Sequence, residues 1–189
     1  ASVEEAVRLG ADAVGYTLYV GSPSQPDDFL QVAEIREDCE RLGMPLIIWS
    51  YPRGEAIEEK GGRDSLYAID YAARVALELG ADIMKLNLPK TDNPKSGDQK
   101  KPYDTLSLAP AEAIQKVIDS AGRGMVIISG GSKQSDEDLL EKAEICMAGG
   151  ATGLIFGRNM WQRPWEESLA LTEKIKEILA KYSRPEPFK

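Results

Sequence analysis

The chain has 189 residues, of which 42% are hydrophobic and 29% are charged, and this composition suits one globular domain over residues 1–189. Its formal net charge of −8 gives no overall basic field, which argues against nucleic acid or an anionic membrane surface as a partner. No apolar run reaches the roughly 18 residues that a membrane helix needs, and no signal peptide is recognisable.

Cysteine and histidine usage narrows the chemistry further. Cys39 and Cys146 lie far apart and form neither a zinc-binding spacing nor a disulfide framework, which indicates a reducing, cytoplasmic location. The chain contains no histidine, so lysine, tyrosine or a carboxylate must move protons in any enzymatic reaction. The sequence predicts no metal site and no cofactor.

A unit of helix, glycine and apolar strand recurs along the chain. A glycine follows the last turn of each of the first five predicted helices, where its left-handed conformation can end the helix at little cost. The predicted helices span 3–9, 27–42, 65–79, 110–121, 136–148 and 164–182, the stop glycines are at 10, 43, 80, 122 and 149, and the predicted strands span 13–20, 46–51, 82–88, 125–129 and 153–156.

Continuous apolar strands that alternate with helices predict an α/β fold with a parallel sheet. Two architectures fit: an open doubly wound sheet and a TIM (β/α)8 barrel, which has about 250 residues when complete. On the barrel interpretation the five predicted strands correspond to about strands 4 to 8, and the domain is N-terminally truncated. The polar segment 89–104 is either a lid or a disordered insertion.

Lys85 is the first candidate catalytic residue, because it stands inside an apolar strand. Partial burial would lower its pKa and leave more of the neutral amine, which can attack a carbonyl and form a Schiff base. The alternative is a strand-end lysine that reaches water or pairs with Asp82. Both interpretations remain open from the strand alone.

Trp49 and Tyr51 end another apolar strand and share one of its faces, since side chains alternate along a strand. Tyr51 could transfer a proton at the carboxyl end of that strand. The alternative is that both rings only pack the core and its rim. Trp161 and Trp165 are expected to dock the last helix rather than to form a ligand cage.

Two glycine turns follow the last two strands and suggest an anion site. Ser129, Gly130 and Gly131 form the first turn, and the second contains Gly157 and Arg158. Glycines let backbone N–H groups approach an anion, and arginine offers a planar fork to phosphate oxygens. In (β/α)8 enzymes the loops after strands seven and eight often bind phosphate, so the placement agrees with the barrel interpretation.

Five segments together resemble archaeal-type class I fructose-bisphosphate aldolases, within the wider group of deoxyribose-phosphate-aldolase-like enzymes. They cover residues 10–17, 49–54, 80–85, 129–131 and 157–159. The resemblance implies a barrel in which Lys85 forms the Schiff base, Tyr51 acts as general acid and base, and Trp49 lines the pocket. It implies that Ser129, Gly130, Gly131, Gly157 and Arg158 bind a substrate phosphate.

The implied reaction is the reversible cleavage of fructose 1,6-bisphosphate to dihydroxyacetone phosphate and glyceraldehyde 3-phosphate, by a homo-oligomer that needs no cofactor. The aspartate of the family's first strand has no counterpart in the chain, and the segment after Lys85 departs from the family pattern. Three alternatives follow: an aldolase or synthase for another phosphorylated sugar or keto acid, a sugar-phosphate isomerase or synthase in which Lys85 acts electrostatically, and a non-catalytic barrel fragment that binds a phosphometabolite. The chain alone is expected to have little activity.

Overall fold

The computed structural model describes residues 2–182, in which helices alternate with parallel strands. Every predicted helix and strand is present, and its ends differ from the predicted ends by at most two residues. The elements in chain order are α1 (Val3–Arg8), β1 (Val14–Leu18), α2 (Gln25–Leu42), β2 (Leu46–Ser50), α3 (Glu55–Glu58), α4 (Leu66–Glu78), β3 (Ile83–Leu86), η1 (Ser96–Asp98), η2 (Tyr103–Thr105), α5 (Pro110–Ser120), β4 (Met125–Ser129), α6 (Asp136–Ala148), β5 (Gly153–Ile155), α7 (Arg158–Trp161) and α8 (Trp165–Tyr182).

The order of the strands decides between the two predicted architectures. The strands pair in parallel in sequence order, β1-β2-β3-β4-β5. Each right-handed connection therefore advances in the same direction and places its helix on the same face of the sheet, as in a barrel. A doubly wound sheet reverses its strand order and covers both faces, so that alternative is wrong. The described strands form an open arc of a (β/α) barrel, with β1 and β5 at its edges.

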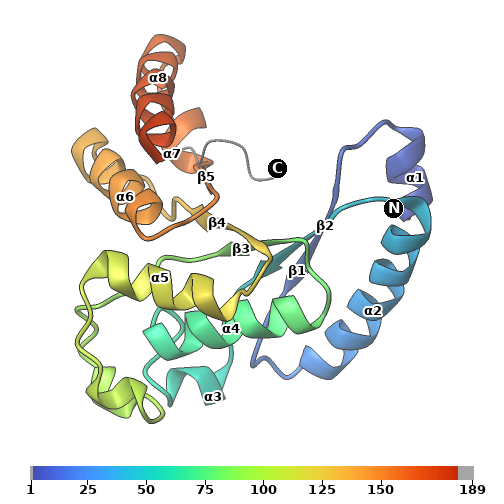
Figure 1. Cartoon of the computed structure of the whole chain (residues 1–189), viewed down its shortest axis with the longest axis horizontal. Coiled ribbons are helices and arrows are strands. Elements are labelled where there is room, and N and C mark those ends of the chain that lie inside the picture. The colour runs from blue at the N-terminus through green and yellow to red at the C-terminus, as the bar shows by residue number, and fades with distance from the viewer. Residues whose placement is uncertain (1, 183–189) are drawn as a thin grey trace.

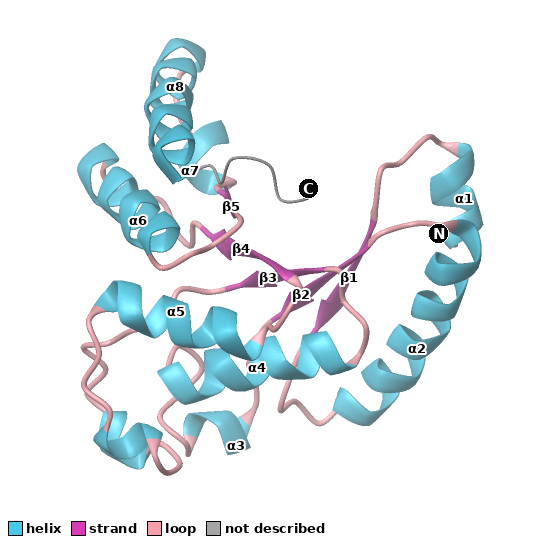
Figure 2. Ribbon diagram, in the orientation of Figure 1, coloured by secondary structure: helices cyan, strands magenta, loops and turns pink. Residues whose placement is uncertain are grey.

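The helices enclose the convex side of this arc. Figures 1 and 2 show them around three sides of the strands, with the fourth side open between α8 and α1. Leu46 and Ile48 of β2 are buried beneath the helices, as are Met84 and Leu86 of β3. The alternate residues point to the concave face, which is the face that lines the interior of a barrel.

Four of the five stop glycines adopt the predicted left-handed conformation, with φ between 59° and 89° at Gly10, Gly43, Gly80 and Gly122. Gly149 is the exception. It caps α6 with a right-handed φ of −74°, and the left-handed residue is Gly150, at 94°. Because two glycines follow this helix, the sequence does not specify which of them turns the chain.

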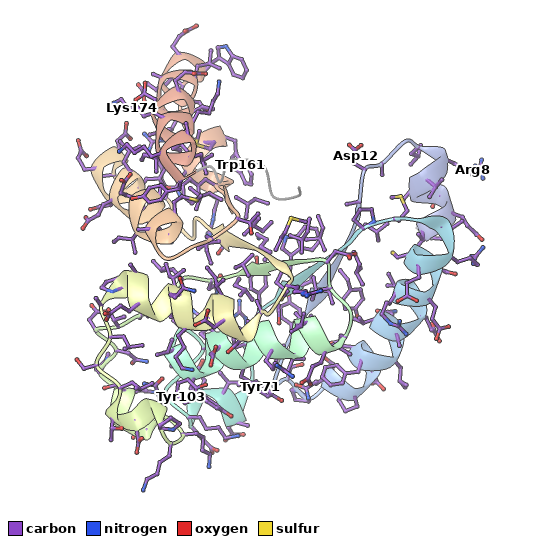
Figure 3. All side chains as sticks on the ribbon, in the orientation of Figure 1. Arg8, Asp12, Tyr71, Tyr103, Trp161 and Lys174 are labelled. Carbon is purple, nitrogen blue, oxygen red and sulfur yellow. The ribbon has the colours of Figure 1, made fainter. Side chains whose placement is uncertain are left out.

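The segment after β3 packs against α4 and is not a disordered insertion. The buried carboxylate of Asp70 accepts a hydrogen bond from the hydroxyl of Tyr103 and lies 3.4 Å from the ammonium of Lys116. Nearer the start of the helix, the backbone N–H of Tyr67 donates to the side-chain oxygen of Gln99 at 3.0 Å. These contacts fix the segment to the side of α4 (Figure 3).

The two tryptophans near α8 do not dock that helix, contrary to the prediction. Trp161 and Trp165 are 73% and 72% exposed. Leu171, Ile175 and Ile178 bury the inner side of α8 instead. Among residues 2–182, no helix has both the length and the apolar character needed to cross a membrane.

Candidate active site

A cavity of about 740 Å³ lies at the carboxyl ends of strands β2 to β5. Seven of the eight predicted site residues line it, and Trp49 does not. In parallel α/β sheets the loops that follow the strands meet at this edge, so residues distant in sequence converge there. The lining residues from the prediction are Tyr51, Lys85, Ser129, Gly130, Gly131, Gly157 and Arg158.

Lys85 and Tyr51 are in direct contact on the concave face. Trp49 is the register partner of Lys85 across β2 and β3, and Tyr51 lies two residues further on the same side of the chain. The half-buried ammonium of Lys85 donates a hydrogen bond to the hydroxyl of Tyr51 and lies 5.1 Å from the centre of its ring. Asp82 accepts instead from the backbone N–H of Leu46 at 2.8 Å, so it is not the partner of Lys85.

Trp49 lies beside the cavity and covers a glycine of the neighbouring strand. A Cβ atom at Gly15 would be 2.2 Å from the Trp49 ring, so only glycine allows the ring to lie across β1. The ammonium of Lys85 is 5.8 Å from the centre of that ring, within the range of a cation–π contact. The indole therefore lies beside the amine without lining the cavity.

Asn87 is a lining residue that the sequence analysis missed. It follows Lys85 by two positions, and its side-chain oxygen accepts a hydrogen bond of 2.8 Å from the hydroxyl of Ser129. The bond joins the ends of β3 and β4 between the amine and the first glycine turn. The period-two alternation along β3 is a signal that could have identified Asn87.

The turn after β4 has the features of an anion site. Gly131 takes a left-handed φ of 76°, and the backbone N–H groups of Gly131 and Ser132 have no hydrogen-bond partner in the described structure. The fully buried side chain of Asn159 organises the turn, because its oxygen accepts from the backbone N–H of Gln134 at 3.0 Å and its amide donates to the carbonyl of Ser132 at 3.2 Å. Free N–H donors at a glycine turn suit a phosphate.

The turn after β5 brings Gly157 and Arg158 to the same cavity. A Cβ atom at Gly157 would be 2.4 Å from the ring of Trp161, which also lines the cavity. The guanidinium of Arg158 forms no ion pair with any carboxylate of residues 2–182. It is therefore free to bind an anion.

The cavity is strongly cationic although the chain carries a net charge of −8. Asp64 is the one acidic residue in its described lining, where it is paired with Lys90 at 3.3 Å. Six basic residues line the same space: Arg53, Arg63, Lys85, Lys90, Lys142 and Arg158. The sequence pattern did not point to Arg53, Arg63, Lys90 or Lys142, because only the folded chain brings their loops and helices together. Such a lining attracts a ligand with more than one negative charge.

Comparison with known proteins identifies the family to which the chain belongs. Residues 1–163 match the model of the DeoC/LacD family of aldolases. The chain is 39% identical over 179 residues to the class 1 fructose-bisphosphate aldolase of Thermoproteus tenax, and the match covers 94% of the chain and 59% of that relative. It is 32% identical over 161 residues to the 2-amino-3,7-dideoxy-D-threo-hept-6-ulosonate synthase of Halobacterium salinarum, covering 85% of the chain and 52% of that relative.

A solved structure agrees with these relatives. An archaeal fructose-1,6-bisphosphate aldolase, with its catalytic lysine covalently bound to the carbinolamine intermediate of the substrate, superposes with a TM-score of 0.79 at 35% identity, covering 96% of the chain and 62% of that protein. The fold and the site thus define a (β/α)-barrel protein of the aldolase class. The chain belongs to the DeoC/LacD aldolase family, and it spans between about half and two thirds of the length of these relatives.

Proposed function

We propose that the protein containing this chain is a class I aldolase that reversibly cleaves fructose 1,6-bisphosphate to dihydroxyacetone phosphate and glyceraldehyde 3-phosphate. The observation that carries the proposal is the hydrogen bond from the Lys85 amine to the Tyr51 hydroxyl inside a cationic cavity. A nucleophile and a proton carrier within hydrogen-bond reach are what amine catalysis requires.

In the proposed reaction, the neutral amine of Lys85 attacks the keto carbon of the sugar to form a carbinolamine. Tyr51 gives its proton to the departing hydroxyl, and loss of water leaves a protonated Schiff base, which withdraws electrons from the C3–C4 bond of the sugar. The phenolate of Tyr51 then takes the proton of the hydroxyl on C4, the bond breaks to release the aldehyde, and the electron pair enters the Schiff base as an enamine. Tyr51 returns the proton to the enamine carbon, and hydrolysis releases the ketone and the free amine. The aromatic ring of Trp49 excludes water beside the nitrogen.

The charges of the cavity support a bisphosphate. The glycine turns after β4 and β5 supply free N–H donors and Arg158 to the cavity. Arg53, Arg63 and Lys90 line the same cavity from the segments that follow β2, α3 and β3. More than one cationic group around Lys85 suits a six-carbon sugar with a phosphate at each end.

Borohydride trapping tests the proposal. Reduction in the presence of fructose 1,6-bisphosphate should fix a covalent adduct on the peptide containing Lys85, and mass spectrometry should find none on the peptide of Lys90. The Lys85→Met variant should yield no adduct and no cleavage. Absence of an adduct on Lys85 in the active protein would refute the Schiff-base mechanism, and it would favour an isomerase or a binding protein in which Lys85 acts only through its charge.

A second function has support from one relative. The 32% identity to a 2-amino-3,7-dideoxy-D-threo-hept-6-ulosonate synthase fits an amine enzyme for another phosphorylated sugar or keto acid. The same trapping experiment with several phosphorylated ketoses separates the two possibilities. Fructose 1,6-bisphosphate should give the fastest cleavage if the first proposal holds.

A further inference from the structure

We propose that Lys142 is a phosphate-binding residue of the cavity, which supplies the charge behind the glycine turn that follows β4. The inference rests on the proposed function, because it takes the ligand of this turn to be a substrate phosphate. Lys142 belongs to α6, and no feature of the sequence pattern assigned it a role.

Helix α6 runs back past the turn that precedes it, and this places the ammonium of Lys142 next to that turn. The Nζ atom of Lys142 is 3.2 Å from the carbonyl oxygen of Gly130. A Cβ atom at Gly131 would lie 3.8 Å from the Nζ atom of Lys142. The ammonium therefore adjoins both glycines of the turn, and Lys142 lines the cavity itself.

The charge of Lys142 is not compensated within the described part of the chain. Lys142 forms no ion pair among residues 2–182. Burial lowers its pKa from the usual value for lysine, and the neighbouring Cys146 and Asp64 oppose that effect only in part. An ammonium that has lost water without gaining a counter-ion would be stabilised by an anion in the cavity.

Holding the turn in place does not explain Lys142. The carbonyl of Gly130 also lies within hydrogen-bond distance of the side-chain amides of Gln134, at 3.4 Å, and of Asn159, at 3.5 Å. These neutral groups, together with the bonds of Asn159 to Gln134 and Ser132, already shape the turn. What Lys142 adds is a positive charge beside the unpartnered N–H groups of Gly131 and Ser132.

Isothermal titration with inorganic phosphate, in the protein that contains this chain, tests the assignment. Lys142→Met should raise the dissociation constant for phosphate about tenfold or more, as expected when a hydrogen bond to a charged group is lost. Lys142→Arg should restore most of the affinity, because it returns the charge. Lys174→Met removes the same charge from the exposed face of α8 (Figure 3) and should leave the affinity within twofold of the unsubstituted protein.

The outcomes separate this inference from the proposed function. If the unsubstituted protein does not bind phosphate, the phosphate site and Lys142 fail together. If Lys142→Met is folded and binds phosphate within twofold of the unsubstituted protein, the assignment of Lys142 alone is overturned, and trapping at Lys85 still tests the mechanism. Should Lys142→Met not fold, amine acetylation of the unsubstituted protein decides: phosphate should slow modification of Lys142 several-fold and that of Lys174 not at all, and equal rates would overturn the assignment.

Discussion

Lys85 donates a hydrogen bond to Tyr51 across two adjacent strands, and this bond joins the only two side chains that the resemblance assigned to catalysis. The parallel register produces the contact. Trp49 pairs with Lys85, so the next residue on the concave side of the β2 chain is Tyr51. The tyrosine oxygen thus lies where a proton must move if the amine binds a carbonyl carbon.

Tyr51→Phe removes that oxygen and leaves the ring. We expect kcat to fall about 100-fold or more, in line with the usual contribution of general acid–base catalysis, because the bond-breaking step loses its proton acceptor. The adduct on Lys85 should still form under borohydride, although more slowly. Tyr71→Phe, in which a partly exposed ring of α4 loses its hydroxyl, is the control and should keep its activity. A Tyr51→Phe protein with unchanged kcat would exclude Tyr51 as the proton carrier.

The strands and helices could be predicted from local patterns, because apolar runs and helix-ending glycines are features of neighbouring residues in the sequence. The alternation of residues was also enough to place Trp49 and Tyr51 on one face of the sheet. The same local patterns could not decide between a barrel arc and a doubly wound sheet, because that choice depends on strand order, which is a long-range property. The resemblance to a known family carried that choice.

The rest of the cavity depended on how loops and helices meet. Arg63 and Lys90 reach the lining from segments after α3 and β3, and Lys142 from the middle of a helix whose sequence resembles any solvated amphipathic helix. For Trp161, the sequence predicted a packing contact that the structure does not contain. Its position near the last helix predicted packing, but the short helix α7 leaves its ring largely exposed beside Gly157, where it lines the cavity.

Asn87→Ala tests the bond between the ends of β3 and β4. The substitution leaves the hydroxyl of Ser129 without its acceptor and removes a polar group next to the amine, so kcat/KM for fructose 1,6-bisphosphate should fall about tenfold. The matched control is Gln115→Ala, which deletes an amide whose hydrogen bond to Asp119 lies on the exposed side of α5. Steady-state kinetics on both variants gives the comparison, and equal values for the two would remove Asn87 from the site.

Gly131→Ala tests whether the turn after β4 binds phosphate, because its effect on phosphate affinity can be compared with its effect on stability. Its φ of 76° costs an alanine about 1 kcal/mol of stability, and the new methyl would also enter the turn beside Lys142. Gly43→Ala carries the same backbone cost at a φ of 68°, with nothing within 4 Å of its Cβ, at the end of α2. Denaturant unfolding should give similar losses for both variants. Only Gly131→Ala should weaken phosphate binding, and a parallel weakening in Gly43→Ala would contradict the assignment of the turn.

Tyr103 should make stability depend on alkaline pH. Burial, and then the hydrogen bond to the carboxylate of Asp70, raise the pKa of its phenol above the usual value of about 10. Above pH 10 the unfolded chain releases this proton while the folded chain retains it, so the free energy of unfolding falls as pH rises. Below pH 10 the contribution is complete.

Tyr103→Phe should accordingly lose about 1 to 3 kcal/mol at pH 7, because Asp70 loses a buried donor. Its decline in stability above pH 10 should be shallower than that of the unsubstituted protein. Urea titrations between pH 7 and 11 measure both effects. Tyr71→Phe, whose hydroxyl has no hydrogen-bond partner among residues 2–182, is the control, and an equal loss there would exclude the Asp70 contact as the cause.

Gly15→Ala should impair catalysis, although Gly15 itself does not line the cavity. A methyl group at this position would lie 2.2 Å from the Trp49 ring, so the indole must move away from β1 and shift beside Lys85. Misplacement of about 1 Å near a reacting group can cost up to 100-fold in rate, so we expect kcat to fall at least tenfold. Gly153→Ala is the matched control, because it adds a methyl to β5 at an ordinary contact distance of 3.6 Å from Ile127. In Trp49→Ala protein the effect of Gly15→Ala on kcat should disappear, since the ring that it displaces is gone. An undiminished effect in that background would mean that Gly15 acts through some group other than Trp49.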